Sequence, residues 1–591
     1  MKQFLLTMAG VFAGLALFFV GVPILVLGVL AGATHPTVTP NNTVLSLDLR
    51  KDLSDQEPDN PLAAFGGRTL AVSSVIDALH RAETDSRVKA LFVRLPEGGM
   101  TPGEADELRL AFNRFRAAHK PVIVHSQGLY PAGAITSTYM LGAASDELWM
   151  QPGAPFQATG LAAEDVFFKR LFDKYGVTAD FQQRYEYKNA VNGFLYDDYT
   201  AAHRESELSW MGSIYQSSLG AAAADRHKSP AALRATIEAG PYDAAQALAK
   251  GLIDRLGQVR DAEAEALGKG GPGAKLVDLE DYLNSNPRLD GGLSKPVVAV
   301  INAEGDIMTG SSNAGLGSQT INSDDLASAL YAAADDKAVK AIVVRLNSPG
   351  GSDTASEQIL AAVRAAKAKK PLVVSMGAYG ASGGYWVSSA ASAIVAEPST
   401  LTGSIGVFGG KFAVGPALSH FGVDLRQISV GGPYASADNA SEPFTPQQKA
   451  AFAAAIDRVY DGFIARVAEG RRLPPARVRE IARGRVWTGV QAKELGLVDE
   501  IGGFYQAVDK AKALAGLAGQ EVRLKTFTAH KSPFEALQRM LGVSESSLRA
   551  LSAAASVLGD PKAQMLLDQA EDARIRSSQG GALALAPLPR L

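Results

Sequence analysis

The sequence predicts an α/β protein made of two similar repeats that follow a long apolar segment at the N-terminus. Short runs rich in valine and isoleucine alternate with helical patterns, which is typical of a layered fold around a parallel sheet. Several segments of the first half return in the second half, in the same order and about 250 residues later. The chain has 591 residues, which is too long for one ordinary core, so two or more domains are expected.

The apolar N-terminal segment runs from residue 3 to residue 33 without a charged side chain. This length exceeds the roughly 20 residues that span a bilayer. Lys2 precedes the segment and no lysine or arginine follows before Arg50, so we expect a cytoplasmic N-terminus and an exported body. We interpret residues 1–33 as an uncleaved transmembrane anchor. The alternative is a signal peptide cleaved after Ala33, although its apolar region would be about twice the usual length.

The repeats divide the rest of the chain. Residues 88–99 read VKALFVRLPEGG, and residues 339–351 read VKAIVVRLNSPGG. In the same way AKGLIDRLG at residues 249–257 returns as AKELGLVDEIG at residues 492–502. We therefore expect a first repeat over residues 34–290, a second over residues 291–516, and a C-terminal tail of unknown role over residues 517–591.

Two predicted strands and the helix between them indicate how the second repeat folds. Residues 341–346 and 371–377 read as strands buried on both faces. Residues 356–370 read as a helix, because apolar positions recur at helical spacing and basic residues gather at the end. This order of strand, helix and strand implies a parallel sheet.

Ser382 lies in a glycine-rich stretch that reads GAYGASGGYW at residues 377–386. We expect it at the N-terminus of a helix of small residues over positions 382–395, where free N–H groups and the helix dipole favour developing negative charge. The ordinary role of such a serine is a helix N-cap. The first repeat reads AITSTYM where the second reads GASGGYW, so the glycine-rich serine occurs once. A requirement of the fold would appear in both repeats, so the single copy favours a nucleophile.

A glycine pair follows the strand before Ser382. Gly350 and Gly351 can adopt positive φ, and such a turn can aim backbone N–H groups outward, although a plain tight turn is the ordinary meaning of Pro-Gly. Gly383 places one more N–H beside the serine. Fixed backbone donors of this kind stabilise the oxyanion that forms when a serine attacks a carbonyl.

A serine nucleophile also needs a base, and Lys188 is the candidate. It lies between aromatic residues in RYEYKNAVNGF, residues 184–194, and the matching position of the second repeat is alanine. The first repeat therefore has the lysine without the serine, and the second has the serine without the lysine. A lysine base must be neutral, which requires burial away from counter-charges. The nearby carboxylate of Glu186 argues against a neutral Lys188, because it would favour the charged form. The ordinary alternative is that Lys188 is a charged lysine on the surface.

With these motifs and SIGV at residues 404–407, the chain resembles the signal peptide peptidase A (protease IV) family in its long two-repeat bacterial form. The resemblance covers about residues 1–515. It implies a repeated ClpP/crotonase-like fold and a Ser/Lys dyad, with Ser382 as nucleophile, Lys188 as general base, and the loop of Gly350 and Gly351 in the oxyanion hole. Gly383 is our addition to that hole.

The same resemblance implies where the protein works and on what. We expect a homo-oligomeric ring in the bacterial inner membrane, with its catalytic body outside the cytoplasm, that degrades signal peptides released after export. The partners are then apolar peptides and the membrane. Nucleic acid is not expected, because 58 basic residues nearly balance 61 acidic ones. The chain has no cysteine, which excludes thiolate metal sites and a cysteine nucleophile, and we expect no cofactor or metal.

Two other functions fit parts of the sequence. Residues 380–384 match G-x-S-x-G, the nucleophile elbow of α/β-hydrolases, so an esterase using Ser382 with His420 or His530 is the enzymatic alternative. The duplication and the SPGG motif have no place in that fold. The remaining alternative is a non-catalytic membrane scaffold, whose serine would not react with an acylating probe.

Overall fold

A computed structural model describes residues 39–51, 53–56, 70–286, 295–311, 320–528 and 583–585. The predicted anchor over residues 1–33 lies outside the described residues. Within the described ranges, no helix has the length and apolar character needed to cross a membrane.

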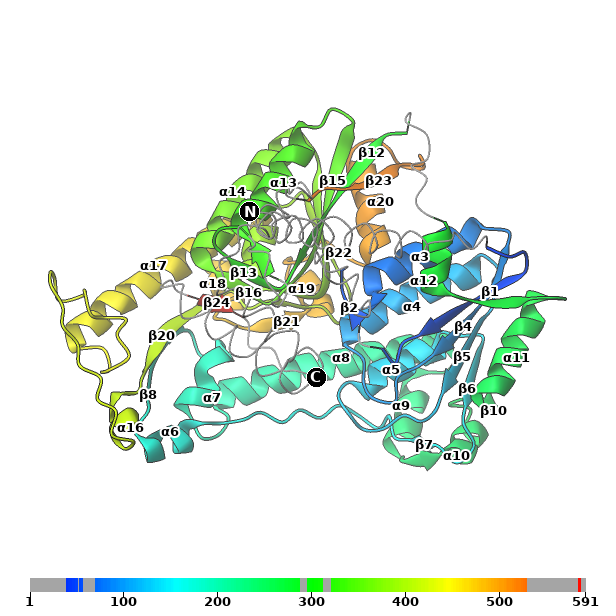
Figure 1. Cartoon of the computed structure of the whole chain (residues 1–591), viewed down its shortest axis with the longest axis horizontal. Helices are drawn as coiled ribbons and strands as arrows, with labels where there is room; N and C mark the ends of the chain where they lie inside the picture. The colour runs from blue at the N-terminus through cyan, green and yellow to red at the C-terminus, as the bar shows by residue number, and fades with distance from the viewer. Residues whose placement is uncertain are drawn as a thin grey trace, which may run out of the picture.

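The first repeat is built on a sheet in which every pair of neighbouring strands is parallel (Figure 1). Its strand order is β10-β6-β5-β4-β1-β11. Along the chain the strands are β1 (Thr43–Asp48), β4 (Val88–Arg94), β5 (Val122–Ser126), β6 (Glu147–Met150), β10 (Arg255–Leu256) and β11 (Lys275–Asp278).

The second repeat has an eight-stranded sheet, and its parallel part has the equivalent strand order, β22-β18-β17-β15-β12-β23. The other two strands extend from the end of β17, where β19 (Leu401–Gly403) pairs parallel with β17 and β21 (Val486–Thr488) antiparallel with β19. Its strands are β12 (Val297–Glu304), β15 (Val339–Ser348), β17 (Leu372–Ala381), β18 (Ala393–Ala396), β22 (Glu500–Ile501) and β23 (Arg523–Thr526). The internal duplication is therefore confirmed. The strand β23 lies beyond residue 516, where we placed the end of the repeat, because its polar sequence RLKT carries little strand signal.

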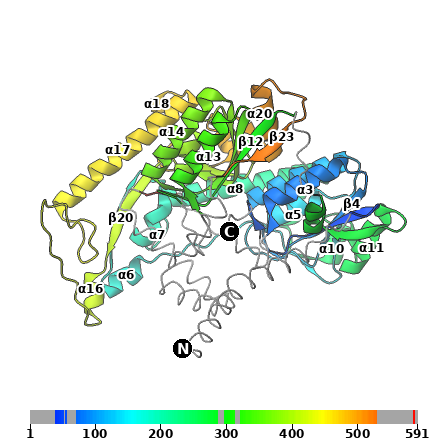
Figure 2. The ribbon, with the colours of Figure 1, turned by 45° about the horizontal axis from the view of Figure 1, so that its top comes forward.

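Helices cover both sheets and join them into one core. On the first sheet, α3 (Val72–Thr84) and α4 (Pro102–Ala117) cover one face and α11 (Val259–Gly270) the other. On the second sheet, α13 (Ser323–Asp335) and α14 (Asp353–Lys369) lie side by side on one face (Figure 2). Its other face packs against α20 (Phe504–Leu514) and α4, so the hydrophobic core of the first repeat continues into the second.

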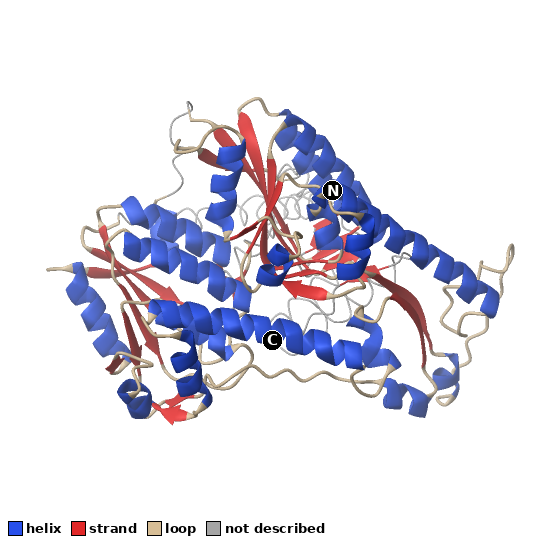
Figure 3. Cartoon of the chain, turned by 180° about the vertical axis from the view of Figure 1, so that it is seen from behind, coloured by secondary structure: helices blue, strands red, loops and turns tan. Residues whose placement is uncertain are grey.

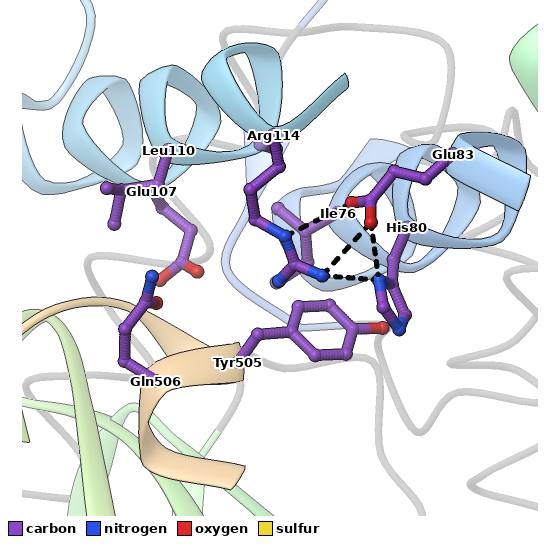
Figure 4. A pocket seen from close by; sticks show the side chains of 9 residues that line it. Ile76, His80, Glu83, Glu107, Leu110, Arg114, Tyr505 and Gln506 are labelled. Atoms are coloured by element: carbon purple, nitrogen blue, oxygen red, sulfur yellow. Dashed lines mark hydrogen bonds and ion pairs between the residues drawn. The ribbon is translucent and has the colours of Figure 1, made fainter. Parts of the chain in front are cut away.

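Polar contacts also connect the repeats. In Figure 4, Arg114 of α4 lies between Glu83 and the ring of Tyr505 on α20. Its Nε is 3.1 Å from Glu83 Oε1, and its guanidinium stacks 4.7 Å from the Tyr505 ring centre. The pocket in this figure lies between helices of the two repeats and contains neither Ser382 nor Lys188.

A third sheet mixes segments of both repeats. Its order is β14-β13-β16-β24-β20-β8. The strand β8 of the first repeat pairs antiparallel with β20 of the second, from Val407 opposite Arg184 to Ala413 opposite Thr178, and forms an arm at the left of Figure 1. The members are β8 (Thr178–Arg184), β13 (Asp306–Met308), β14 (Thr320–Asn322), β16 (Gly350–Ser352), β20 (Val407–Ala413) and β24 (Leu583–Leu585).

The long helix α8 (Ala201–Asp225) runs along the molecule from the arm to the first sheet, as Figure 3 shows from behind. The remaining strands are β2 (Leu53–Ser54), β3 (Leu70–Ala71), β7 (Pro155–Phe156) and β9 (Tyr242–Asp243). The remaining helices are α5 (Ile135–Ala143), α6 (Lys169–Tyr175), the 3₁₀ turn η3 (Asn189–Val191), α7 (Asn192–Leu195), α9 (Pro230–Glu238), α10 (Ala244–Ala249), α12 (Leu279–Ser285), α15 (Gly383–Ser388), α16 (Gly415–Ser419), α17 (Pro446–Arg471), α18 (Pro475–Ile481) and α19 (Gly489–Glu494).

The helix predicted over residues 382–395 is shorter than we expected. It is α15, which ends at Ser388, and Ala393–Ala396 form the strand β18. The residues AIVA are apolar and form a buried strand that pairs in parallel with β17 from Val373 to Met376. Apolar runs of this kind are typical of strands inside a parallel sheet, so they form a strand here and do not continue the helix.

Candidate active site

Ser382 lies at the end of β17, directly before α15, and its side chain does not cap the helix. Its backbone has φ 52° and ψ −115°, a conformation that non-glycine residues rarely adopt. The Ser382 N–H donates to Gly403 O at 2.8 Å, and its carbonyl accepts from Trp386 N at 2.8 Å. A strained backbone held in place by such hydrogen bonds is typical of functional positions. Because the Ser382 side chain makes no capping hydrogen bond, the interpretation of Ser382 as an ordinary N-cap is wrong.

Lys188 of the first repeat meets Ser382 of the second. Its Nζ lies 2.8 Å from Ser382 Oγ, 3.0 Å from Ser404 Oγ and 3.1 Å from Ser404 O. A neutral amine has two N–H donors and one lone pair. The two oxygens of Ser404 can accept the two N–H groups, which leaves the lone pair facing the Ser382 hydroxyl. The lysine and the serine that the sequence placed in different repeats thus lie within hydrogen-bonding distance.

The surroundings of Lys188 favour its neutral form. The side chain is fully buried, and burial lowers the pKa of Lys188 well below its ordinary value of 10.5. Glu186, which argued against a neutral lysine, points elsewhere, because its Oε1 pairs with Arg483 Nη2 at 2.7 Å.

A glycine fixes the backbone of Lys188. Gly484 has φ +82°, and a Cβ at this position would lie 2.6 Å from both the N and the Cβ of Lys188. The Gly484 N–H donates to Ile405 O at 2.9 Å, and Ser404 N–H donates to Arg485 O at 2.8 Å. The loop of residues 483–485 therefore connects the lysine to the segment that carries Ser404.

The glycine pair lies beside Ser382, as predicted from the sequence. A Cβ on Gly383 would lie 3.1 Å from Gly351 N and 3.3 Å from Gly350 Cα. Gly351 has φ +154° and packs so closely on β13 that a Cβ would lie 2.1 Å from Ile307 O. The N–H of Gly350 donates to Ser348 Oγ at 3.2 Å, so it is engaged within the turn. The assignment of Gly350, Gly351 and Gly383 to an oxyanion hole stays a prediction.

The sequence features of peptidase family S49 match residues 114–269 and residues 364–518, one region in each repeat. Protease 4 of Salmonella typhi is 35% identical over 502 residues, which cover 80% of this chain and 78% of the relative. The chain belongs to peptidase family S49.

Two further proteins are similar to this S49 chain over part of their length. The chloroplastic serine protease SPPA of Arabidopsis thaliana is 28% identical to this S49 chain, covering 80% of it and 69% of the plant protein. Among solved structures, ClpP1 from Listeria monocytogenes aligns with a TM-score of 0.22 and 16% identity, covering 35% of this chain and 91% of that one.

The first repeat of this S49 chain has no equivalent of the serine turn. Thr136, two residues inside α5 and three before Tyr139, occupies the position that Ser382 has relative to Tyr385. Tyr139 and Tyr385 are themselves equivalent, since their hydroxyls donate to Leu252 O and Leu497 O. The repeats therefore share the scaffold around the site, whereas only in the second does the helix begin directly after a serine with a strained backbone.

Of the alternative bases, the structure describes only His420, and it does not contact Ser382. His420 is exposed at the end of α16 on the arm, and His530 lies outside the described residues. Lys411, a lysine of the second repeat, donates to Asn439 O at 2.7 Å on the arm. Sequence reasoning did not assign a role to Ser404 or Gly484. Ser404 is the first residue of the motif SIGV, which could have indicated its role. For Gly484 the sequence shows only that the residue is a glycine.

Proposed function

We propose that this chain is a membrane-anchored serine endopeptidase that uses Ser382 as nucleophile and Lys188 as general base to degrade signal peptides released after protein export. The observation that carries the proposal is the 2.8 Å contact between Lys188 Nζ and Ser382 Oγ in a buried site, where none of the residues that the structure describes places a carboxylate against the amine. A neutral lysine in this position has no evident structural use, since it gives up hydration without an ion pair.

The mechanism follows from the geometry. Neutral Lys188 takes the proton of Ser382 Oγ while that oxygen attacks the peptide carbonyl carbon. The N–H groups of Gly351 and Gly383 stabilise the oxyanion. The protonated lysine then gives its proton to the leaving amine, which breaks the peptide bond and leaves an acyl ester on Ser382. In the second half Lys188 takes a proton from water, whose oxygen attacks the ester carbonyl. The protonated lysine then gives that proton to Ser382 Oγ as the ester bond breaks, which releases the acid and restores the free serine and the neutral lysine.

The substrate class rests on the family and on the N-terminal segment. A peptidase tethered by residues 1–33, with its body outside the cytoplasm, would meet signal peptides as they leave the export machinery. Assembly into a homo-oligomeric ring in the bacterial inner membrane is part of the same proposal. It would restrict access to the site to unfolded peptides.

Peptidase assays on a signal peptide test the proposal. We expect Ser382→Ala and Lys188→Arg to lose at least about three orders of magnitude in kcat, since one lacks the nucleophile and the other cannot lose its proton. Lys411→Arg, on the arm, is the matched control and should retain activity. Turnover by Lys188→Arg at the wild-type rate would exclude the dyad. Failure of wild type to react with an acylating probe would favour the non-catalytic scaffold.

A further inference from the structure

The strand β17, which leads to Ser382, has a bulge opposite Asn347. The strands β15 and β17 pair regularly up to Leu346 opposite Met376, and the next pair is Ser348 opposite Gly380. Residues 377–379 of β17 therefore lie opposite a single residue of β15. Extra residues of this kind bend a strand and are typical of positions next to active sites.

The bulge is where β17 changes its neighbour. Before it, residues 373–376 pair with β18, and after it, residues 379–381 pair with β19. The last residue of β19 is Gly403, whose carbonyl accepts the N–H of Ser382 at 2.8 Å. The next residue, Ser404, lies 3.0 Å from Lys188 Nζ. The bulge therefore directs β17 toward the segment that holds both Ser382 and Lys188.

The side chain of Asn347 holds the bulge. Its Oδ1 accepts from Tyr379 N–H at 3.0 Å, and its Nδ2 donates to Glu304 Oε1 at 3.2 Å. The opposite orientation of the amide would set donor against donor. Glu304 also accepts the N–H groups of Asp55 and Gln56 at 3.1 and 2.9 Å. These hydrogen bonds connect the repeat that carries the lysine to the strand that leads to the serine.

The first repeat also packs directly on the bulge. A Cβ on Gly377 would lie 2.8 Å from Asp55 Oδ1, and a Cβ on Gly103 of α4 would lie 2.7 Å from Ala378 Cα. The bulge therefore fits closely against the docked first repeat, and a shift of one would displace the other.

The equivalent strands of the first repeat lack this arrangement. They read RLPEGG where the second repeat reads RLNSPGG, so Pro96 follows the leucine that precedes Asn347 in the other copy. Proline has no side-chain amide. The pairing of β4 with β5 is regular throughout, from Leu91 opposite Val122 to Arg94 opposite His125. The amide and the bulge thus occur in the repeat that carries the strained serine.

Resting on the proposed function, we propose that Asn347 is a positioning residue that places Ser382 through the bulge of β17, with Glu304 holding Asn347 in line with the docked first repeat. The nucleophile is then aligned with Lys188 by the same contacts that join the two repeats.

The first test is a kinetic comparison of two asparagine variants. We expect Asn347→Ala to lower kcat for a signal peptide by at least about 100-fold and to change KM by less than about threefold, since the nucleophile is displaced. Asn322→Ala is the control, because Asn322 Nδ2 donates to Thr320 Oγ1 at 3.0 Å at the end of β14. It should keep the wild-type kcat. A kcat of Asn347→Ala within threefold of wild type would overturn the proposal.

Asn347→Asp adds a readout that a merely structural role would not change. It keeps the acceptor for the strand N–H, but it can donate to Glu304 only while one of the two carboxyls holds a proton. Burial raises the pKa of Glu304 to about 7, and Asp55, paired with Arg345, and Glu104 face it from the first repeat. We expect the ratio of variant to wild-type kcat to fall at least about tenfold from pH 6 to pH 9. A constant ratio would contradict the proposed hydrogen bond.

Amide hydrogen exchange separates this proposal from the catalytic one. In the full chain carrying Ser382→Ala, the Tyr379 amide should exchange at least about tenfold faster with Asn347→Ala than with Asn322→Ala. This measurement needs no turnover, so it can succeed even if the dyad assignment fails. Equal exchange rates would overturn the role of Asn347, whereas an inactive wild type would count against the proposed function.

Discussion

Lys188 illustrates how one residue can serve activity at the expense of stability. Its amine is buried with hydroxyl and carbonyl oxygens and no carboxylate, so the folded protein disfavours the protonated form. The unfolded chain carries no such restriction. Between the folded-state pKa of Lys188 and its unfolded value of 10.5, the unfolded state therefore binds more protons at this residue than the folded state, and stability rises with pH.

This predicts that Lys188→Met, which removes the buried amine, is inactive and yet more stable than wild type at neutral pH. The difference should shrink by about 1.4 kcal/mol per pH unit as the pH rises from the folded-state pKa of Lys188 toward its unfolded value. Denaturant unfolding at several pH values measures it, with Lys411→Met as the control for a lysine that is not fully buried. A variant less stable than wild type throughout would mean that the amine contributes net stabilising hydrogen bonds.

At the scale of elements, the site depends on how the loop of residues 483–485 supports the segment after β8. Gly484 has φ +82°, and a Cβ at this position would collide with the backbone of Lys188. Gly496 has a similar φ of +77°, but a Cβ there would lie 3.7 Å from its nearest neighbour, a methyl group of Leu473. An added Cβ strains both backbones to a similar degree. It collides with the lysine only at the first position.

We therefore expect Gly484→Ala to lower kcat by about 100-fold, because a displacement of about 1 Å at a catalytic group has effects of that size. Gly496→Ala should be destabilised to a similar extent and keep its kcat. Steady-state kinetics below the unfolding temperature compare the two. Equal kcat values would mean that the loop does not position Lys188.

For the whole molecule, a buried ionic cluster joins the repeats that carry the two halves of the dyad. Arg345 of β15 is 3% exposed. Its Nη2 lies 2.5 Å from Asp55 and its Nη1 2.9 Å from Glu107, both in the first repeat, and 3.5 Å from Glu397. Burial raises the pKa of Glu397 well above its usual range. Arg94, the equivalent residue of the first repeat, is half-buried and donates to Gln127 within its own repeat.

Removing the arginine should separate the repeats. We predict that Arg345→Met costs about 3–5 kcal/mol of stability, since it leaves buried carboxylates without a counter-charge. Peptidase activity should fall before global unfolding, because Lys188 would withdraw from Ser382. Arg94→Met, the matched control, should cost less than about 1.5 kcal/mol and keep activity. Thermal unfolding followed together with activity measures both effects, and coincident loss in the two variants would contradict the role of the cluster.

Much of this architecture could be predicted from the sequence because it repeats locally. The valine-rich strands, the helix after Gly351 and the single-copy Ser382 are visible as patterns, and the absence of the lysine from one repeat pointed to Lys188. The contacts that the sequence does not determine are those between distant segments. The pairing of β8 with β20, the support of Lys188 by Gly484 and the pairing of Leu583–Leu585 with β16 all join residues that no short-range pattern connects.

The claim that a neutral Lys188 activates Ser382 is tested most directly by the pH dependence of covalent labelling at Ser382. Wild type, Lys188→Arg and Lys411→Arg are treated with a serine-acylating probe across a pH series, and the labelled residue is identified by peptide mass. We expect labelling of Ser382 in wild type and Lys411→Arg to rise with pH through one inflection well below 10.5, because only the unprotonated amine accepts the proton. Lys188→Arg should remain unlabelled throughout. Labelling of Lys188→Arg at the wild-type rate, with the same inflection, would show that another group is the base.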